Sequence, residues 1–213
     1  MTASPREQLC EAAASFYHRG YAFGSTGNLS VQIEGRIWIT PTGRPLRKLS
    51  PDDLAWLDLE GNPLNGNRPS KEYPFHLGAY RSAGERVKAI VHLHSTYSVA
   101  LSCLEGLPDK EPLPAFTPYY LMRVAPLAVL PYFRPGSHEL ASAVAAAAVQ
   151  HDCMLLGNHG LVCLGTSLEE AVDRSEELEQ TARLFFLLRN ERVRSLTAGE
   201  QEEIHRAFRC LKP

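Results

Sequence analysis

The sequence contains 213 residues, of which 44% are hydrophobic and 22% are charged, and its formal net charge at pH 7 is −2. This composition is typical of a globular protein with a substantial core and argues against a disordered chain. Because the basic residues are scattered, neither a nucleic-acid groove nor a polybasic membrane patch is indicated, and we expect a small-molecule partner.

The length of the chain and the lack of a dividing linker favour a single domain over residues 1–213, and the N-terminus and the cysteines favour the cytoplasm. The first residues lack the apolar core of a signal peptide, and no run reaches the roughly 18 apolar residues of a membrane span. The cysteines are odd in number and widely spaced, which is typical of reduced packing thiols. They are Cys10, Cys103, Cys153, Cys163 and Cys210.

The first third of the chain predicts a helix, a β-hairpin and a second helix. Ser4 can cap a helix, Pro5 suits its first turn, and Glu7 completes a capping box. Two β-prone runs then flank Glu34-Gly35, which is typical of a hairpin. The expected elements are a helix from 4 to about 19, strands at 31–33, 36–40 and 54–59, and a helix that begins at 69–72.

Two loops of small residues are candidates for binding a phosphate. Small residues expose backbone N–H groups and hydroxyls, which can hold a phosphate without a nucleotide-binding loop motif. Gly27 and Asn28 lie in the first loop, and Thr42 and Gly43 lie in the second. The same composition also suits simple hairpin ends, so that alternative stays open.

The helix that begins at 69–72 places three polar residues at its N-terminus. Ser70, Lys71 and Glu72 would lie where free backbone N–H groups and the helix dipole favour an anion. The alternative for Lys71 is a solvated surface residue with no ligand.

An apolar run that reads as a buried strand ends in His92 and His94. Side chains alternate faces along a strand, so these two histidines project from the same side and can bind one metal ion. Glu72 upstream and His159 downstream would complete a shell of three histidines and a carboxylate, which suits Zn²⁺. A chance His-X-His pair with a packing role is the alternative.

The rest of the chain predicts strands that alternate with helices. Gly157 and Gly160 flank His159 and permit a tight connection with close approach to a ligand. The expected elements are a strand at 88–94, a helix at 95–104, a loop at 105–117, a strand at 127–130, a helix from 137 to about 151, strands at 153–156 and 161–164, a helix from 167 to about 194, and a final short helix capped near 197.

Five motifs in this order resemble the class II aldolase and adducin-head family from about residue 9 to residue 194. They are Gly27-Asn28-Leu29-Ser30, Thr40-Pro41-Thr42-Gly43, Pro69-Ser70-Lys71-Glu72, His92-Leu93-His94 and Asn158-His159-Gly160. The resemblance implies an α/β fold, a three-layer α/β/α sandwich around a central mixed, mainly antiparallel sheet. It also implies a homotetramer with active sites between subunits.

The resemblance implies Zn²⁺, or another divalent metal such as Mn²⁺, bound by His92, His94 and His159. Glu72 would be a further ligand or the acid/base. The phosphate contacts that it implies come from Gly27, Asn28, Thr42, Gly43 and Ser70. In the aldolases of the family, a tyrosine from the neighbouring subunit assists proton transfer, and Tyr120 lies in the matching region. Tyr119 is the second choice, and either tyrosine could instead pack in the core.

One departure from the aldolase pattern indicates the reaction. Several aldolases have Ser-Ser-Glu where this chain has Ser70-Lys71-Glu72, and the chain is most similar to the branch that decarboxylates 3-oxo-tetronate 4-phosphates. Lys71 and Arg134 would have the carboxylate of such a phosphorylated sugar acid to neutralise. The implied activity is decarboxylation to dihydroxyacetone phosphate and CO₂ through a metal-bound enediolate. The alternatives are a fuculose-phosphate type aldolase, a ribulose-phosphate 4-epimerase, and a non-catalytic adducin-like structural domain.

Overall fold

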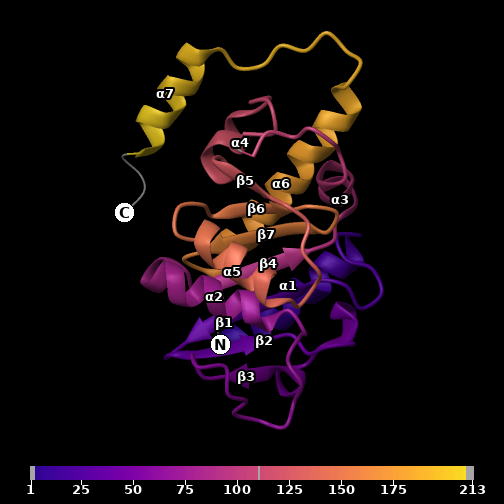
Figure 1. Cartoon of the computed structure of the whole chain (residues 1–213), viewed down its shortest axis with the longest axis vertical. Helices are drawn as coiled ribbons and strands as arrows, with labels where there is room; N and C mark the ends of the chain where they lie inside the picture. The colour runs from indigo at the N-terminus through magenta and orange to yellow at the C-terminus, as the bar shows by residue number, and fades with distance from the viewer. Residues whose placement is uncertain (1–2, 110, 210–213) are drawn as a thin grey trace.

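A central seven-stranded sheet organises the computed structural model, which describes residues 3–109 and 111–209 (Figure 1). The strands, in spatial order, are β3 (Ala55–Leu57), β2 (Arg36–Ile39), β1 (Asn28–Ile33), β4 (Ala89–Leu93), β7 (Gly160–Gly165), β6 (Cys153–Leu156) and β5 (Leu127–Leu130). Neighbouring strands are antiparallel except for β5 and β6, which are parallel. The expected mixed, mainly antiparallel sheet is confirmed.

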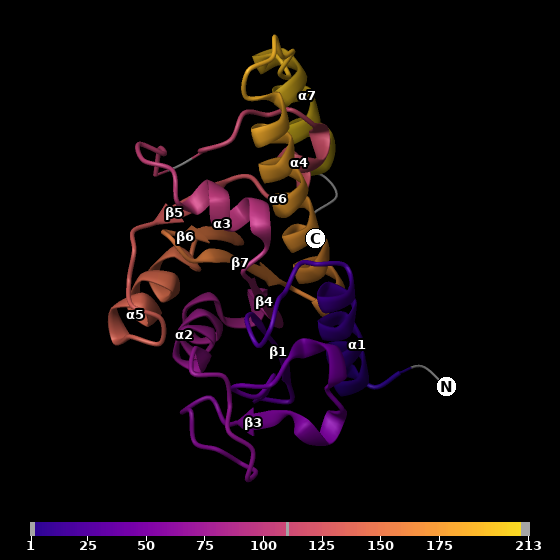
Figure 2. The same ribbon diagram turned by 90° about the vertical axis from the view of Figure 1, so that its right-hand side faces the viewer.

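Helices cover both faces of this sheet. They are α1 (Pro5–His18), α2 (Tyr73–Ala83), α3 (Thr96–Ser102), α4 (Pro118–Arg123), α5 (His138–Ala147), α6 (Leu168–Leu188) and α7 (Ala198–Arg209), with 3₁₀ turns η1 (Leu46–Lys48), η2 (Pro51–Asp53) and η3 (Gly84–Arg86). Figure 2 shows α2 and α5 on one side of the sheet and α1 and α6 on the other. The buried apolar side chains accordingly form two clusters, one under α2 and α5 and one under α1, α3, α4 and α6. The expected three-layer sandwich is confirmed.

Helix α1 begins as its sequence predicts, whereas α6 ends earlier. The Ser4 side chain accepts a hydrogen bond from the Glu7 backbone, and the Glu7 side chain accepts one from the Ser4 backbone. The prediction that α6 continues to about residue 194 is wrong, because the helix ends at Leu188. Residues 189–194 are exposed, so a further helical turn would have no apolar face to bury, and packing rather than propensity stabilises most protein helices.

The alternation of side chains along β1 and β4 prepares the site. Leu29 and Leu93 point into the cluster under α1 and α6 and are fully buried. Asn28 and His92 are cross-strand partners in the β1–β4 ladder and therefore lie side by side on the opposite face, under α2. The sheet thus brings a buried amide and a buried imidazole together beneath the start of one helix.

Two further expectations concern the cysteines and the membrane. The four cysteines within the described ranges are free thiols, and three of them are buried, which agrees with a packing role. Cys210 lies outside the described residues.

Among the helices of residues 3–109 and 111–209, none combines the length and the apolar character that crossing a bilayer requires.

Candidate metal centre

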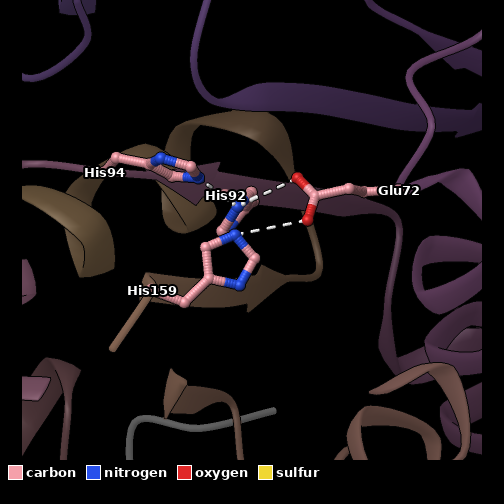
Figure 3. A group of neighbouring side chains, drawn as sticks. All are labelled: Glu72, His92, His94 and His159. Atoms are coloured by element: carbon pink, nitrogen blue, oxygen red, sulfur yellow. Dashed lines mark hydrogen bonds and ion pairs between the residues drawn. The ribbon is translucent and has the colours of Figure 1, made fainter. Parts of the chain in front are cut away.

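Four side chains from distant parts of the sequence converge at the C-terminal end of β4, the middle strand of the sheet (Figure 3). Glu72 is the N-cap residue of α2, and His92 lies near the end of β4. His94 follows that strand directly, and His159 lies in the turn between β6 and β7. The ligand atoms that these residues can offer all lie within 4.8 Å of one another. The structure therefore brings together the four residues for which metal binding was predicted.

The distances between the facing atoms suit a small divalent ion. The Nε2 atom of His92 lies 2.9 Å from Nε2 of His94 and 3.2 Å from Oε2 of Glu72. The Nε2 atom of His159 lies 3.3 Å from Oε1 of Glu72. Neighbouring ligands of a tetrahedral zinc ion with bonds of ~2.1 Å lie about 3.4 Å apart, so only small adjustments are needed.

Buried atoms without partners provide an independent test of this fit. Among the described residues, Oε1 of Glu72 and both ring nitrogens of His159 are buried and have no hydrogen-bond partner. Buried polar atoms nearly always have partners, because an unsatisfied one costs about 1–3 kcal/mol. A cation between Glu72 and His159 would satisfy the carboxylate oxygen and one imidazole nitrogen at once. The residues present therefore fit a divalent metal.

The pKa shifts favour the protonation states that bind metal. Burial raises the pKa of Glu72, but the opposing effects of His92, His159 and Asn28 outweigh it and hold that pKa well below its usual range. Burial, assisted by the charge of His92, lowers the pKa of His94 to about 3 and that of His159 to about 4. At neutral pH, a carboxylate thus faces two neutral imidazoles, which is the form in which these groups coordinate metals.

A cleft of about 850 Å³ opens beside the four residues, and Glu72, His94 and His159 line it. All residues for which phosphate contact was predicted line the same cleft, as does Lys71: Gly27, Asn28, Thr42, Gly43 and Ser70. Asn158, from the motif Asn158-His159-Gly160, also lines it, as do three polar residues that the sequence did not single out: Ser25, Thr26 and Thr96. Short polar side chains near the small-residue loops were the only signal that could have found them.

Backbone hydrogen bonds within these loops determine which donor groups remain free to bind an anion. The backbone N–H of Thr42 donates to Arg68 and that of Ser70 donates to Thr40, so hydroxyls are the donors that Thr42 and Ser70 retain. The expectation of free backbone N–H groups at the N-terminus of α2 is wrong for Tyr73, Pro74 and Phe75, the first three residues of the helix. Tyr73 and Phe75 donate within the turn, and Pro74 has no N–H.

Two glycines allow the loops to approach the end of β4 closely. Gly27 has a φ of +79°, and a Cβ atom there would lie 3.0 Å from the backbone oxygen of His92. A Cβ atom at Gly160 would lie 2.3 Å from the backbone oxygen of Leu93, which is far inside van der Waals contact. Side chains at these positions would separate the two loops from the strand that carries the histidines.

The other predicted site residues lie apart from these four: Lys71 is at the surface of the cleft, and Tyr120 is in the core. Lys71 is exposed and takes part in none of the ion pairs found in the part of the chain that the structure describes. Tyr120 is 1% exposed, donates its hydroxyl to Glu111, and does not line the cleft. Burial and Glu111 raise its pKa. The structure therefore does not bring Tyr120 to the site of its own chain, whereas Tyr119 and Tyr132 are exposed.

Comparisons with known proteins agree with this geometry. The family model for the Class II Aldolase and Adducin N-terminal domain matches residues 7–186. The 3-oxo-tetronate 4-phosphate decarboxylase of Haemophilus influenzae is 48% identical over 200 residues, which are 93% of this chain and 95% of that protein. The L-fuculose phosphate aldolase of Methanococcus maripaludis strain C5 is 40% identical over 82% of this chain and 91% of its own length. The solved structure of YgbL from Klebsiella pneumoniae, with 46% identity, superimposes with a TM-score of 0.90 over 94% of this chain and 97% of that one.

Proposed function

This chain belongs to the class II aldolase and adducin family, and we propose that it is a metal-dependent lyase that decarboxylates a 3-oxo-tetronate 4-phosphate. The products would be dihydroxyacetone phosphate and CO₂. The observation that carries the proposal is the centre of Glu72 and three histidines, which shares its cleft with Lys71 in a chain 48% identical to such a decarboxylase.

We assign the metal to His92, His94 and His159, with Glu72 as a fourth ligand or as the proton-transfer group. This set of nitrogen and oxygen donors suits Zn²⁺, with Mn²⁺ as the second choice. When bound, the ion would act as a Lewis acid that stabilises negative charge on substrate oxygens.

The cleft offers separate groups for the two ends of the substrate. The phosphate is assigned to the loops of Gly27, Asn28, Thr42, Gly43 and Ser70. The substrate carboxylate is assigned to the Lys71 ammonium, which lacks an ion-pair partner among the described residues and lines the same cleft. This arrangement would hold the bond between the carboxylate carbon and C2 near the centre of the site.

The reaction then needs one proton rather than a base. When the carboxylate leaves as CO₂, the electron pair of the broken bond moves onto the ketone oxygen and gives an enediolate, and C2 must then be protonated. Glu72 lines the cleft and is assigned that proton transfer, in which the ionised carboxylate takes up a proton from solvent and passes it to C2. Aldol cleavage differs because a base must first remove a substrate hydroxyl proton. The earlier assignment of Tyr120 to proton transfer stays a prediction, which its burial does not support.

We also propose the assembly and the setting that the family suggests. The chain would be one domain in a cytoplasmic homotetramer whose active sites lie between subunits. One exposed aromatic side chain supports an interface there, since Phe23 lines the cleft, is 51% exposed and would be covered by a neighbouring subunit.

The second candidate function is sugar-phosphate aldol cleavage, which the similarity to the fuculose phosphate aldolase favours. The test is to incubate zinc-loaded protein with racemic 3-oxo-tetronate 4-phosphate and, separately, with fuculose 1-phosphate. Release of CO₂ together with dihydroxyacetone phosphate from the first substrate would support the decarboxylase. Triose phosphate from the second substrate alone, without CO₂ from the first, would instead identify an aldolase.

A further inference from the structure

A chain of buried hydrogen bonds leads from the core under α2 to the Glu72 carboxylate. The Asn28 amide nitrogen donates to Oε2 of Glu72 over 3.0 Å, and Oδ1 of Asn28 lies 2.6 Å from Nε2 of His76. The Nδ1 atom of His76 lies 2.7 Å from the Ser30 hydroxyl, which lies 2.8 Å from the Tyr80 hydroxyl. Asn28, Ser30, His76 and Tyr80 are each at most 3% exposed.

The direction of each hydrogen bond follows from the carboxylate end. An ionised carboxylate can only accept, so the Asn28 amide must present its N–H to Glu72. The amide oxygen then faces His76 and can only accept, which requires a hydrogen on Nε2 of His76. Because burial and the charge of His92 lower the pKa of His76 to about 3, the ring is neutral and its Nδ1 accepts from Ser30. The Tyr80 hydroxyl in turn donates to Ser30.

We propose that His76 is a positioning residue, which acts through Asn28 to orient Glu72 toward the metal centre. The proposal rests on the proposed function for the role of Glu72. If the amide of Asn28 turned over, its oxygen would face a carboxylate oxygen, and two acceptors would meet in a buried site. The donor on His76 prevents this, because it holds the amide oxygen on the far side.

The consequence for Glu72 is that its two oxygens differ. Oε2 receives the hydrogen bond from Asn28, whereas Oε1 has no hydrogen-bond partner among the described residues and lies 3.3 Å from Nε2 of His159. This hydrogen-bond relay from Tyr80 to Glu72 therefore holds Oε2 in place and leaves Oε1 for the ion or for proton transfer. Packing alone does not account for the relay, since a core that needed only volume would be filled by apolar side chains.

The first test reads the tautomer of His76 without any substitution. Long-range ¹H–¹⁵N correlation spectra of the histidine-labelled protein distinguish a hydrogen on Nε2 from one on Nδ1. We expect a neutral ring with its hydrogen on Nε2, both before and after zinc is added. A hydrogen on Nδ1 alone would overturn the proposal, because Asn28 would then lose its fixed orientation.

The second test compares zinc affinity in variants by competition with a chelator. His76→Leu removes the donor to Asn28 and should weaken zinc binding about 10- to 100-fold. Losses of this size are common when a residue that orients a metal ligand through hydrogen bonds is removed. His76→Gln can again donate to Asn28 and should recover most of that affinity. Ser175→Ala is the matched control, since it removes a buried hydroxyl that donates to Ala171 within α6, far from the relay in sequence. It should bind zinc as the unchanged protein does.

Steady-state kinetics then separate this proposal from the proposed function. We expect His76→Leu to lower kcat, because Glu72 loses its orientation, and to raise KM only as far as the phosphate contact assigned to Asn28 is weakened. Decarboxylation with unchanged zinc affinity and kcat in His76→Leu would overturn the role of His76 alone. Weakened zinc binding in a protein that decarboxylates no keto acid would support the relay and contradict the proposed function.

Discussion

His92 donates its Nδ1 hydrogen to the backbone carbonyl oxygen of Leu161 over 2.8 Å. The carbonyl belongs to β7, the strand paired with β4, so the sheet itself fixes the tautomer of the imidazole. Nε2 is therefore the nitrogen that faces the site, on the side where His94 and Glu72 lie. A backbone partner of this kind is the usual way in which proteins orient a metal-binding histidine.

Substitution of His94 tests the metal site with little risk to the fold. His94 lies just beyond the end of β4 and is less buried than His92, so His94→Ala should still fold. We expect its zinc affinity to fall by about 100-fold or more, because loss of a ligand should cost more than loss of a residue that only orients one. Metal content after dialysis and chelator competition measure this. His138→Ala, at the exposed start of α5, is the control and should retain zinc, whereas equal retention by both variants would exclude His94 as a ligand.

The sequence was sufficient to predict the residues that the structure brings together at the candidate metal centre, because each lies in a local pattern. His92 and His94 follow the period of a strand, and His159 lies between glycines in a tight turn. The relay behind Glu72 was not predictable in the same way. His76 occupies an ordinary helical position, and its partner Asn28 is 48 residues away. Only the register of β1 against β4 and the packing of α2 bring them together. The early end of α6 was missed for the same reason, since tertiary packing decides it.

Replacement of Lys71 tests the assignment of the substrate carboxylate. A hydrogen bond to a charged group contributes about 1.5–3 kcal/mol, and the exposure of Lys71 places it at the lower end. Lys71→Ser should therefore lower kcat/KM for the keto acid about tenfold. Lys48→Ser, at an exposed residue of η1 that does not line the cleft, should turn over the substrate normally. Unchanged turnover in Lys71→Ser would remove the argument for this residue.

Substitution of Gly27 tests the close approach of the first loop to β4. Gly27→Ala should lower the free energy of unfolding by about 1–3 kcal/mol, because the alanine meets both a positive φ and the His92 backbone. Gly24→Ala separates the two causes, since Gly24 also has a positive φ but has no atom within 4 Å of the added Cβ. Its cost in urea unfolding should be smaller. Equal costs for the two variants would show that the contact with β4 contributes nothing.

A buried carboxylate on α6 holds the turn that follows His94. Glu179 is 8% exposed and accepts four hydrogen bonds from the start of α3. The donors are Ser95 Oγ, Tyr97 N, Ser98 N and Ser98 Oγ. Glu179→Gln should lower the free energy of unfolding by about 2–3 kcal/mol. Both carboxylate oxygens accept hydrogen bonds here, and the NH₂ group of glutamine cannot accept them.

The control for Glu179 is Glu176→Gln on the same helix, where the carboxylate pairs with Arg19 in a partly exposed position. Such pairs contribute about 0–1 kcal/mol, so a small change in urea unfolding is expected there. If Glu179→Gln were as stable as Glu176→Gln, the buried carboxylate would not hold the turn.

Metal-dependent decarboxylation is tested with 3-oxo-tetronate 4-phosphate whose carboxylate carbon is ¹³C, by measuring the labelled CO₂ that is released. Protein stripped of metal by a chelator should release no labelled CO₂, and addition of Zn²⁺ or Mn²⁺ should restore its release together with one dihydroxyacetone phosphate per CO₂. His138→Ala should behave as the unchanged protein does, and His94→Ala should stay inactive with either ion. Labelled CO₂ at the same rate from stripped and reloaded protein, or none from either, would contradict the account.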